Sequence, residues 1–131
     1  MGQGQLRALK RYAAIETESR VESATPHQRV RILFDELLRS FDASAHAMRV
    51  GDRQKMLDKH TRALTILHAL ETSLDFKRGG EVAISLATIY RESRKLLLES
   101  TATNTAEPME LGRSYIGEIA DAWSQIGSQV D

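Results

Sequence analysis

A run of apolar residues at helical spacing begins just after Pro26 and constrains the fold more than any other feature of the chain. Apolar side chains recur every three or four residues, at Val30, Leu33, Phe34, Leu37, Leu38, Phe41, Ala45 and Met48. This spacing lines one face of an α-helix, which repeats every 3.6 residues. The chain must therefore bury one face of a long helix against other elements.

Local signals mark both ends of this helix. Thr25 suits the N-cap, Pro26 the first helical position, and Gln28 the capping-box position three residues after the cap. At the other end, Gly51 can terminate the helix and Asp52 can cap the next one. We therefore expect the first bundle helix to begin at Pro26 and to end close to Gly51.

Three further runs share the helical period. They begin near Met56, after Gly80 and near Pro108, and small polar residues separate the last two. No segment alternates as a strand would, so the sequence predicts an all-α fold. Four amphipathic helices with short connections favour an antiparallel up-down four-helix bundle. The length of 131 residues fits one domain, which we divide into a bundle over residues 25–127 and a short N-terminal helical arm over residues 1–24.

Two adjacent glycines, Gly79 and Gly80, interrupt the apolar pattern. A glycine just past a helix end adopts the left-handed conformation that other residues resist. Lys77 and Arg78 suit the negative end of a preceding helix, and Glu81 suits the positive end of a following one. We therefore expect the second helix to run up to these glycines and the third to start directly after them.

Charge and composition exclude several classes of protein. Eighteen basic residues balance eighteen acidic ones, which gives no general attraction to nucleic acid or to an anionic membrane. The chain has no cysteine, so disulfides and thiolate metal sites are excluded. It also lacks an apolar stretch long enough for a secretory signal or a membrane span. These features predict a cytoplasmic protein without membrane insertion.

Residues suited to catalysis or metal binding lack the required spacing. The four histidines include no i,i+4 pair, and no Glu-x-x-His motif of a di-iron bundle occurs. No serine lies in a nucleophile elbow, and no phosphate-binding loop is present. We expect neither an enzyme nor a cofactor or metal site, although a metal-dependent bundle enzyme remains an alternative that bound metal would reveal.

The predicted third helix carries more apolar surface than a narrow bundle seam needs. One explanation is that this helix is the most buried of the four. The other is a partner surface, in which small residues let a second helix approach and larger ones flank it. Candidate contacts on the second and third helices are Leu70, Leu74, Ala83, Ile84, Ala87 and Leu98. In the arm, Tyr12, Ile15 and Val21 could either staple the chain onto the bundle or form a removable lid.

Two blocks of the sequence resemble the FliS family of flagellar secretion chaperones. The first, VESATPHQRVRILFDELL at residues 21–38, contains the Thr25–Pro26 cap and an apolar-aromatic-acidic triplet. The second, SLDFKRGGEVAISLATIY at residues 73–90, contains the Gly79–Gly80–Glu81 turn. The blocks occur in the family order, with a tyrosine before them and a late tryptophan after them. Departures from the family pattern are Arg29, Lys77 and Ser85.

The resemblance implies a cytosolic helical bundle that binds the disordered C-terminal segment of flagellin. Binding would prevent premature polymerisation and prepare flagellin for the flagellar type III export apparatus. The resemblance also implies that the Tyr12 arm covers the apolar binding surface in the free protein, and that no cofactor is used. The export gate, a flagellar regulator and a co-chaperone are further candidate partners. The alternative is a structural, adaptor or regulatory bundle that binds another amphipathic helix.

Overall fold

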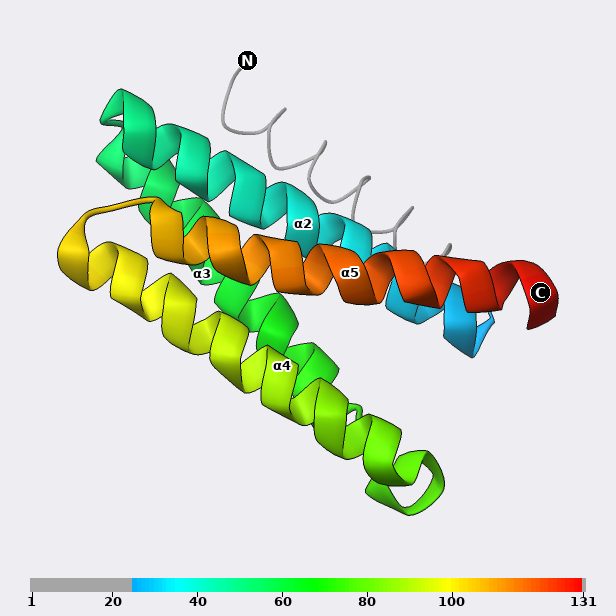
Figure 1. Ribbon diagram of the computed structural model, residues 1–131. Helices are drawn as coiled ribbons and strands as arrows, with labels where there is room; N and C mark the ends of the chain where they lie inside the picture. The colour runs from blue at the N-terminus through cyan, green and yellow to red at the C-terminus, as the bar shows by residue number, and fades with distance from the viewer. Residues whose placement is uncertain (1–24, 131) are drawn as a thin grey trace, which may run out of the picture.

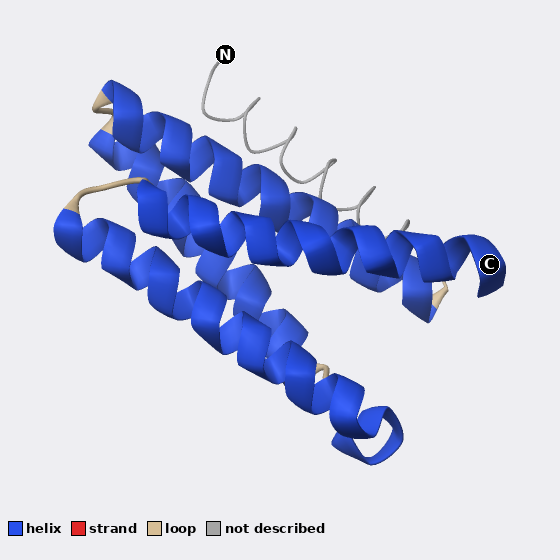
Figure 2. Cartoon of the chain, in the orientation of Figure 1, coloured by secondary structure: helices blue, strands red, loops and turns tan. Residues whose placement is uncertain are grey.

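In a computed structural model, residues 25–130 form four helices and no strand (Figures 1 and 2). The structure describes the backbone of these residues and the side chains of residues 25–126. The arm over residues 1–24, with Tyr12, Ile15 and Val21, lies outside the described residues. The helices are α2 Pro26–Val50, α3 Arg53–Thr72, α4 Phe76–Thr103 and α5 Glu107–Val130.

The four helices form the antiparallel bundle that the sequence predicts. Each helix packs on the next along the chain, and α5 closes the ring by packing on α2. Short connections join consecutive helices, so neighbours run in opposite directions (Figure 1). The α2–α3 packing is the most extensive, whereas α3 and α4 pack together least.

The start and end of α2 follow the sequence signals. The Thr25 hydroxyl accepts a hydrogen bond from the Gln28 amide at 3.1 Å, and the Gln28 side chain accepts one from the Thr25 amide at 3.0 Å. This reciprocal pair is a capping box, with Pro26 in the first turn. Gly51 ends the helix in the left-handed conformation, and Asp52 caps α3. The predicted boundaries of this helix are confirmed.

The predicted end of the second helix is wrong, whereas the expected break in the helix at the glycines is present, inside α4. The helix α3 ends at Thr72, and Asp75 caps α4 by accepting a hydrogen bond from the Arg78 amide. Lys77 and Arg78 therefore lie in the first turn of α4. Asp75 was not predicted as an N-cap, although Asp is a favoured residue at that position. The glycines lie inside α4, where Gly80 forms a kink with φ 52° and ψ −125°.

Glycine is needed at both positions of this kink, for different reasons. The dihedral angles of Gly80 are close to those of the first central residue of a type II′ turn, which glycine adopts without steric cost. Gly79 has no positive φ, but a Cβ atom there would lie 2.9 Å from the Cβ of Ala83. The pair therefore lets α4 change direction after one turn, as the lower right of Figure 1 shows.

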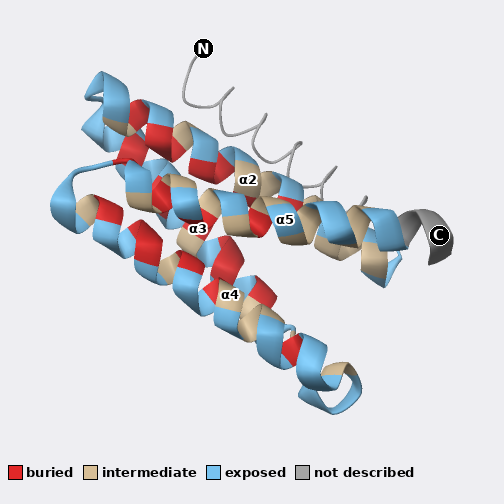
Figure 3. Cartoon of the chain, viewed as in Figure 1, coloured by how far each residue is buried: buried red, intermediate tan, exposed pale blue. Residues whose placement is uncertain are grey.

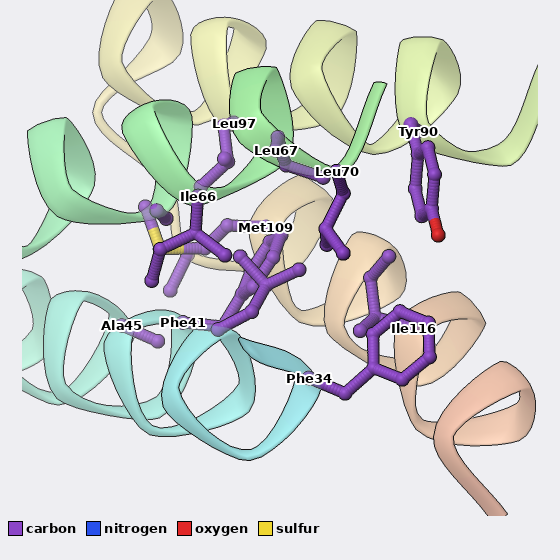
Figure 4. Close-up of a cluster of buried hydrophobic side chains, with 13 residues drawn as sticks. Phe34, Phe41, Ala45, Ile66, Leu67, Leu70, Tyr90, Leu97, Met109 and Ile116 are labelled. Carbon is purple, nitrogen blue, oxygen red and sulfur yellow. The ribbon is translucent and has the colours of Figure 1, made fainter. Parts of the chain in front are cut away.

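The core follows the inward faces of all four helices, as the buried residues in Figure 3 show. Its central side chains meet between the helices in Figure 4, with Phe34 and Phe41 from α2, Leu67 and Leu70 from α3, Tyr90 and Leu97 from α4, and Met109 and Ile116 from α5. Most of these side chains are almost fully buried. Each buried Leu or Phe contributes about 1.5–3 kcal/mol of hydrophobic stabilisation.

Polar groups inside the bundle join neighbouring helices. The Ser44 hydroxyl donates to the Met56 carbonyl at 3.1 Å, and the Met109 amide donates to the Ser100 hydroxyl at 2.7 Å. The Nε2 atom of His60 lies 3.0 Å from the Leu97 carbonyl oxygen, which links α3 to α4. These bonds satisfy buried polar atoms that would otherwise destabilise the core.

The α4 helix diverges from α5 towards the end that carries Gly80, so the bundle is open there (Figure 1). At the opposite end, the short α4–α5 connection holds the two helices together. The divergence separates the N-terminal half of α4 from the C-terminal half of α5. This open end positions the candidate functional site.

Substitution of Gly80 by Ala should lower the free energy of unfolding by about 1–2 kcal/mol, because alanine is strained at a positive φ. Gly117→Ala provides the matched control. Gly117 lies within the α5 helix, where an added Cβ would meet only the flexible end of Arg113. We expect that substitution to be neutral or to stabilise slightly. Urea unfolding followed by circular dichroism would measure both, and equal effects would contradict the assigned role of Gly80.

Candidate functional site

An apolar groove of about 310 Å³ lies at the open end of the bundle. All four helices contribute to it, together with the connection between α3 and α4. Its lining residues are Val30, Phe34, Leu70, Ser73, Leu74, Asp75, Arg78, Gly79, Val82, Ala83, Leu86, Tyr90 and Trp123. The groove continues the hydrophobic core to the surface, so an apolar partner could extend the core by filling it.

The walls of the groove are positioned by helix ends. The first turns of α2 supply Val30 and Phe34, and the last turns of α3 supply Leu70. The kink at Gly80 then brings the next turns of α4 over the groove, where Val82 lies on the rim and is 64% exposed. Phe76 and Ile126 are further large exposed apolar side chains on α4 and α5. The kink therefore determines the shape of the opening.

A clasp between His27 and Trp123 joins α2 to α5 beside the groove. The two rings stack with centroids 4.6 Å apart and an interplanar angle of 4°. The Trp123 indole Nε1 donates to the His27 carbonyl at 2.9 Å, and the His27 Nε2 atom lies 2.6 Å from the Trp123 carbonyl oxygen. Phe34 packs edge-on against the same indole. The clasp fixes Trp123, which is the only tryptophan of the chain, in the groove wall.

Tyr90 forms the deep part of the groove from the α4 side. Only 2% of its surface is exposed, and burial raises its pKa to about 12. Figure 4 shows its ring at the edge of the core cluster beside Leu70, with the hydroxyl directed away from α4. The side chain therefore presents a neutral hydroxyl, not a phenolate, at physiological pH.

Charge is confined to the rim of the groove. Asp75 and Arg78 are the only lining residues with ionisable carboxylate or guanidinium groups, and they pair at 3.8 Å. Both side chains are largely exposed, so the pair contributes little to stability. The remaining walls present apolar groups, backbone and a few hydroxyls, which suits an apolar and uncharged ligand surface.

Three of the partner contacts expected from the sequence line the groove: Leu70, Leu74 and Ala83. Leu70 and Ala83 are buried and Leu74 is half-buried. Their side chains come from α3, the connection and α4, and the groove brings them together.

Three other expected contacts do not line the groove. Ile84 is 58% exposed, and Leu98 is exposed on the same outward side of α4 because 14 residues correspond to nearly four turns. Ala87 is half-buried between these positions and the core. Adjacent helical residues point about 100° apart, which separates Ile84 from the buried Ala83. The partner contacts on α4 therefore fall on two surfaces, the groove and the outer face.

Sequence reasoning missed several groove residues, among them Phe34, Val82, Tyr90 and Trp123. Phe34 was recognised as an apolar position of a predicted helix, but spacing within one helix does not tell which core positions lie at an open end. Nothing in the local pattern distinguishes Phe34 in the groove from Phe41 in the closed core. The Gly79–Gly80 pair is the sequence signal at this end of the bundle, and it was interpreted as a turn between two helices.

The described residues provide neither a metal cluster nor a membrane-spanning helix. Residues 25–130 contain no cluster of three or more His, Cys, Asp or Glu side chains that could hold a metal ion. None of the four helices is both long enough and apolar enough to cross a membrane.

Comparison with known proteins identifies the family. The chain matches the family described as flagellar protein FliS over residues 8–130. It is 32% identical to the flagellar secretion chaperone FliS of Salmonella typhimurium, over 90% of this chain and 88% of that protein. It is 30% identical to the FliS of Escherichia coli, over 87% and 85% of the two chains. The chain belongs to the FliS family.

A relative from Pseudomonas aeruginosa, the flagellar secretion chaperone FliSB, is 26% identical over 92% of this chain and 96% of its own length. The matched FliS region includes all four helices and therefore every residue that lines the groove. Of the three departures from the FliS pattern, Lys77 and Ser85 are exposed on α4 and Arg29 is half-exposed on α2. None of them lines the groove.

Stability at alkaline pH should depend on Tyr90. The folded protein retains the Tyr90 proton up to a pKa of about 12, whereas the unfolded chain releases it near pH 10. The free energy of unfolding is therefore unaffected by this group below pH 10 and falls as the pH rises towards 12, by up to about 2–3 kcal/mol.

Urea unfolding of the wild type and of Tyr90→Phe between pH 8 and pH 11.5 would measure this contribution as the difference between the two slopes. Tyr115→Phe, on α5, serves as the control. Parallel pH dependence of the wild type and Tyr90→Phe would contradict the assigned environment of Tyr90.

Proposed function

We propose that this protein is an export chaperone that binds the C-terminal segment of flagellin in the groove and along the adjoining outer face of α4. Binding keeps the segment from polymerising prematurely and helps to deliver flagellin to the flagellar type III export apparatus. The observation that carries this proposal is an apolar groove that opens the core to the surface at one end of the bundle. The names of the relatives, flagellar secretion chaperones, support a flagellar export substrate as the occupant.

The groove suits a segment that becomes ordered on binding. Such a client loses conformational entropy, so it needs an extended apolar contact to compensate. A micromolar complex requires about 8 kcal/mol of net binding free energy. Because a fully buried Leu, Val or Phe contributes about 1.5–3 kcal/mol, several client side chains must be buried. The groove, with the exposed Val82 on its rim, provides an apolar surface of this kind.

The outer face of α4 extends the proposed contact. Ile84 and Leu98 are exposed apolar residues on this face, separated by polar side chains such as Thr88 and Lys95. Ile84 lies about 200° around the helix from Val82, so a client that leaves the groove must pass around α4 to reach it. We assign this face a secondary role, because its apolar residues are isolated and make no cavity.

The proposal makes the protein a binding protein and not an enzyme, with no cofactor, and places it in the cytoplasm where flagellin awaits export. The export gate and a flagellar regulator or co-chaperone are further proposed partners. The N-terminal arm, with Tyr12, Ile15 and Val21, is proposed as the lid of the groove in the free protein. The chain enters α2 at Thr25, at the same end of the bundle as the groove, so the arm is attached next to it.

Titration with the C-terminal segment of flagellin from the same organism tests the function. We expect a saturable complex near one-to-one stoichiometry with a Kd in the micromolar range or below, and an increase in helical signal by circular dichroism. Emission of Trp123 should shift to shorter wavelength, because the client displaces water from the indole at the groove wall. Calorimetry would give the stoichiometry and the affinity.

An amphipathic helical peptide of matched length and unrelated sequence is the control for this titration. Absence of binding up to about 100 μM, which corresponds to less than roughly 6 kcal/mol, would reject flagellin as the client. Equal affinity for the control peptide would instead favour a general adaptor for amphipathic helices.

Val82→Asp should weaken client binding at least tenfold without unfolding the bundle, because docking would bury a carboxylate on the groove rim. Val50→Asp is the matched control. Val50 is an equally exposed valine, at 63%, and it ends α2 at the opposite end of the bundle from the groove. Calorimetry would compare the affinities and circular dichroism the folding. A similar loss of affinity in both variants would show that the groove is not the binding site.

Ile84→Asp and Ala87→Arg, in the same assay, would measure the contribution of α4 outside the groove lining. We expect each to weaken binding by less than Val82→Asp does. Unchanged affinity for both would confine the client to the groove.

A further inference from the structure

The Tyr90 hydroxyl is a polar group in the deep part of the groove, and the apolar contacts described above give it no role. The Tyr90 ring is buried with the core, yet Tyr90 also lines the groove. Its hydroxyl makes no hydrogen bond to any described residue, and no other interaction of Tyr90 affects its pKa besides burial. Ser44, His60 and Ser100 have partners on neighbouring helices, and the buried Ser93 hydroxyl, which has none, does not line the groove.

The position of the hydroxyl follows from two observations. The oxygen is not among the fully enclosed side-chain atoms of residues 25–126 that lack a partner, and Tyr90 lines the groove. Figure 4 shows it at the far tip of the ring, directed away from α4, near the edge of the cluster that contains Phe34 and Ile116. A side chain that is 98% buried, since only 2% is exposed, thus offers one unused hydrogen-bonding group to whatever fills the groove.

We propose that the Tyr90 hydroxyl is a specificity-determining anchor that hydrogen-bonds a short neutral polar side chain, Ser, Thr, Asn or Gln, on the otherwise apolar face of the client helix. The inference rests on the proposed function of the groove. A client that presented only apolar side chains would leave the hydroxyl buried without a partner, which is unfavourable. A site of this kind discriminates strongly between clients, because a client that lacks the polar side chain leaves the Tyr90 hydroxyl without a partner.

The chemistry of the groove selects a neutral side chain over the other candidates. Backbone carbonyls of a helical client are already bonded within the helix, so a side chain must supply the partner. A charged side chain would have to lose its hydration beside apolar walls, because the ionisable pair Asp75–Arg78 is at the rim and exposed. Tyr90 keeps its proton at physiological pH, so it can donate as well as accept a hydrogen bond.

The substitution Tyr90→Phe isolates the hydroxyl, because it leaves the ring and its packing in place. We expect it to weaken binding of the flagellin C-terminal segment about threefold to tenfold, the range of one hydrogen bond. Thermal unfolding at neutral pH should stay unchanged or shift slightly upwards, since the hydroxyl makes no hydrogen bond to any described residue. Tyr115→Phe is the matched control, because Tyr115 is half-buried on α5 and does not line the groove.

The outcomes separate this inference from the proposed function. If the wild type binds and Tyr90→Phe binds within twofold of it, the anchor role is overturned while the chaperone function stands. If the wild type itself does not bind, both fail. A loss of affinity that accompanies a lowered unfolding temperature, or one that Tyr115→Phe shares, would also overturn the inference. Either result would show that the substitution acts by disturbing the structure and not by removing a hydrogen bond to the client.

A double-mutant cycle would identify the client side chain. Each Ser, Thr, Asn and Gln of the client segment is replaced in turn by Ala, and its effect is measured with the wild type and with Tyr90→Phe. We expect one position to lose its effect when the hydroxyl is absent. Additive effects at every position would show that Tyr90 recognises no client side chain, which contradicts the inference.

Discussion

The other helices are organised by burial of the apolar face of α2. This helix packs more extensively than any other, on α3 along one side and on α5 along the other. Its aromatic side chains Phe34 and Phe41 are almost fully buried, and each contacts residues from the other helices in the core cluster. At Gly112 of α5 an added Cβ would lie 3.2 Å from Phe41, so a small residue allows close approach. The bundle is therefore built around α2.

The groove arises because this core is closed at one end and open at the other. At the closed end, the Ser100 hydroxyl and the Met109 amide tie α4 to α5, and the ion pair of Arg49 with Glu110 ties α2 to α5. At the open end, α4 starts with a turn capped by Asp75 and then bends at Gly80. Core residues such as Phe34 and Tyr90, although almost fully buried, consequently line the groove. A binding site for apolar groups requires this incomplete closure.

Much of the fold could be predicted from the sequence, but less of the site could. The caps at Thr25 and Asp52 depend on residues close by in the chain, and so does the period of the apolar residues. Both were therefore predicted correctly. The end of α3 was misplaced because the strong Gly79–Gly80 signal was given more weight than the Asp75 cap five residues before Gly80. The partner contacts expected on α4 do not share one surface, because Ala83 and Ile84 are adjacent in sequence but point to different surfaces.

The sequence by itself determined that the chain forms amphipathic helices, where α2 begins and ends, and that the residues resemble one family of chaperones. These properties follow from side-chain period and capping, which act over a few residues. Only the tertiary structure decided that α4 diverges from α5, that Val30, Leu70, Val82 and Trp123 meet in one groove, and that the Tyr90 hydroxyl is left without a partner. Those features depend on the relative placement of helices, which is fixed by packing between residues far apart in the chain.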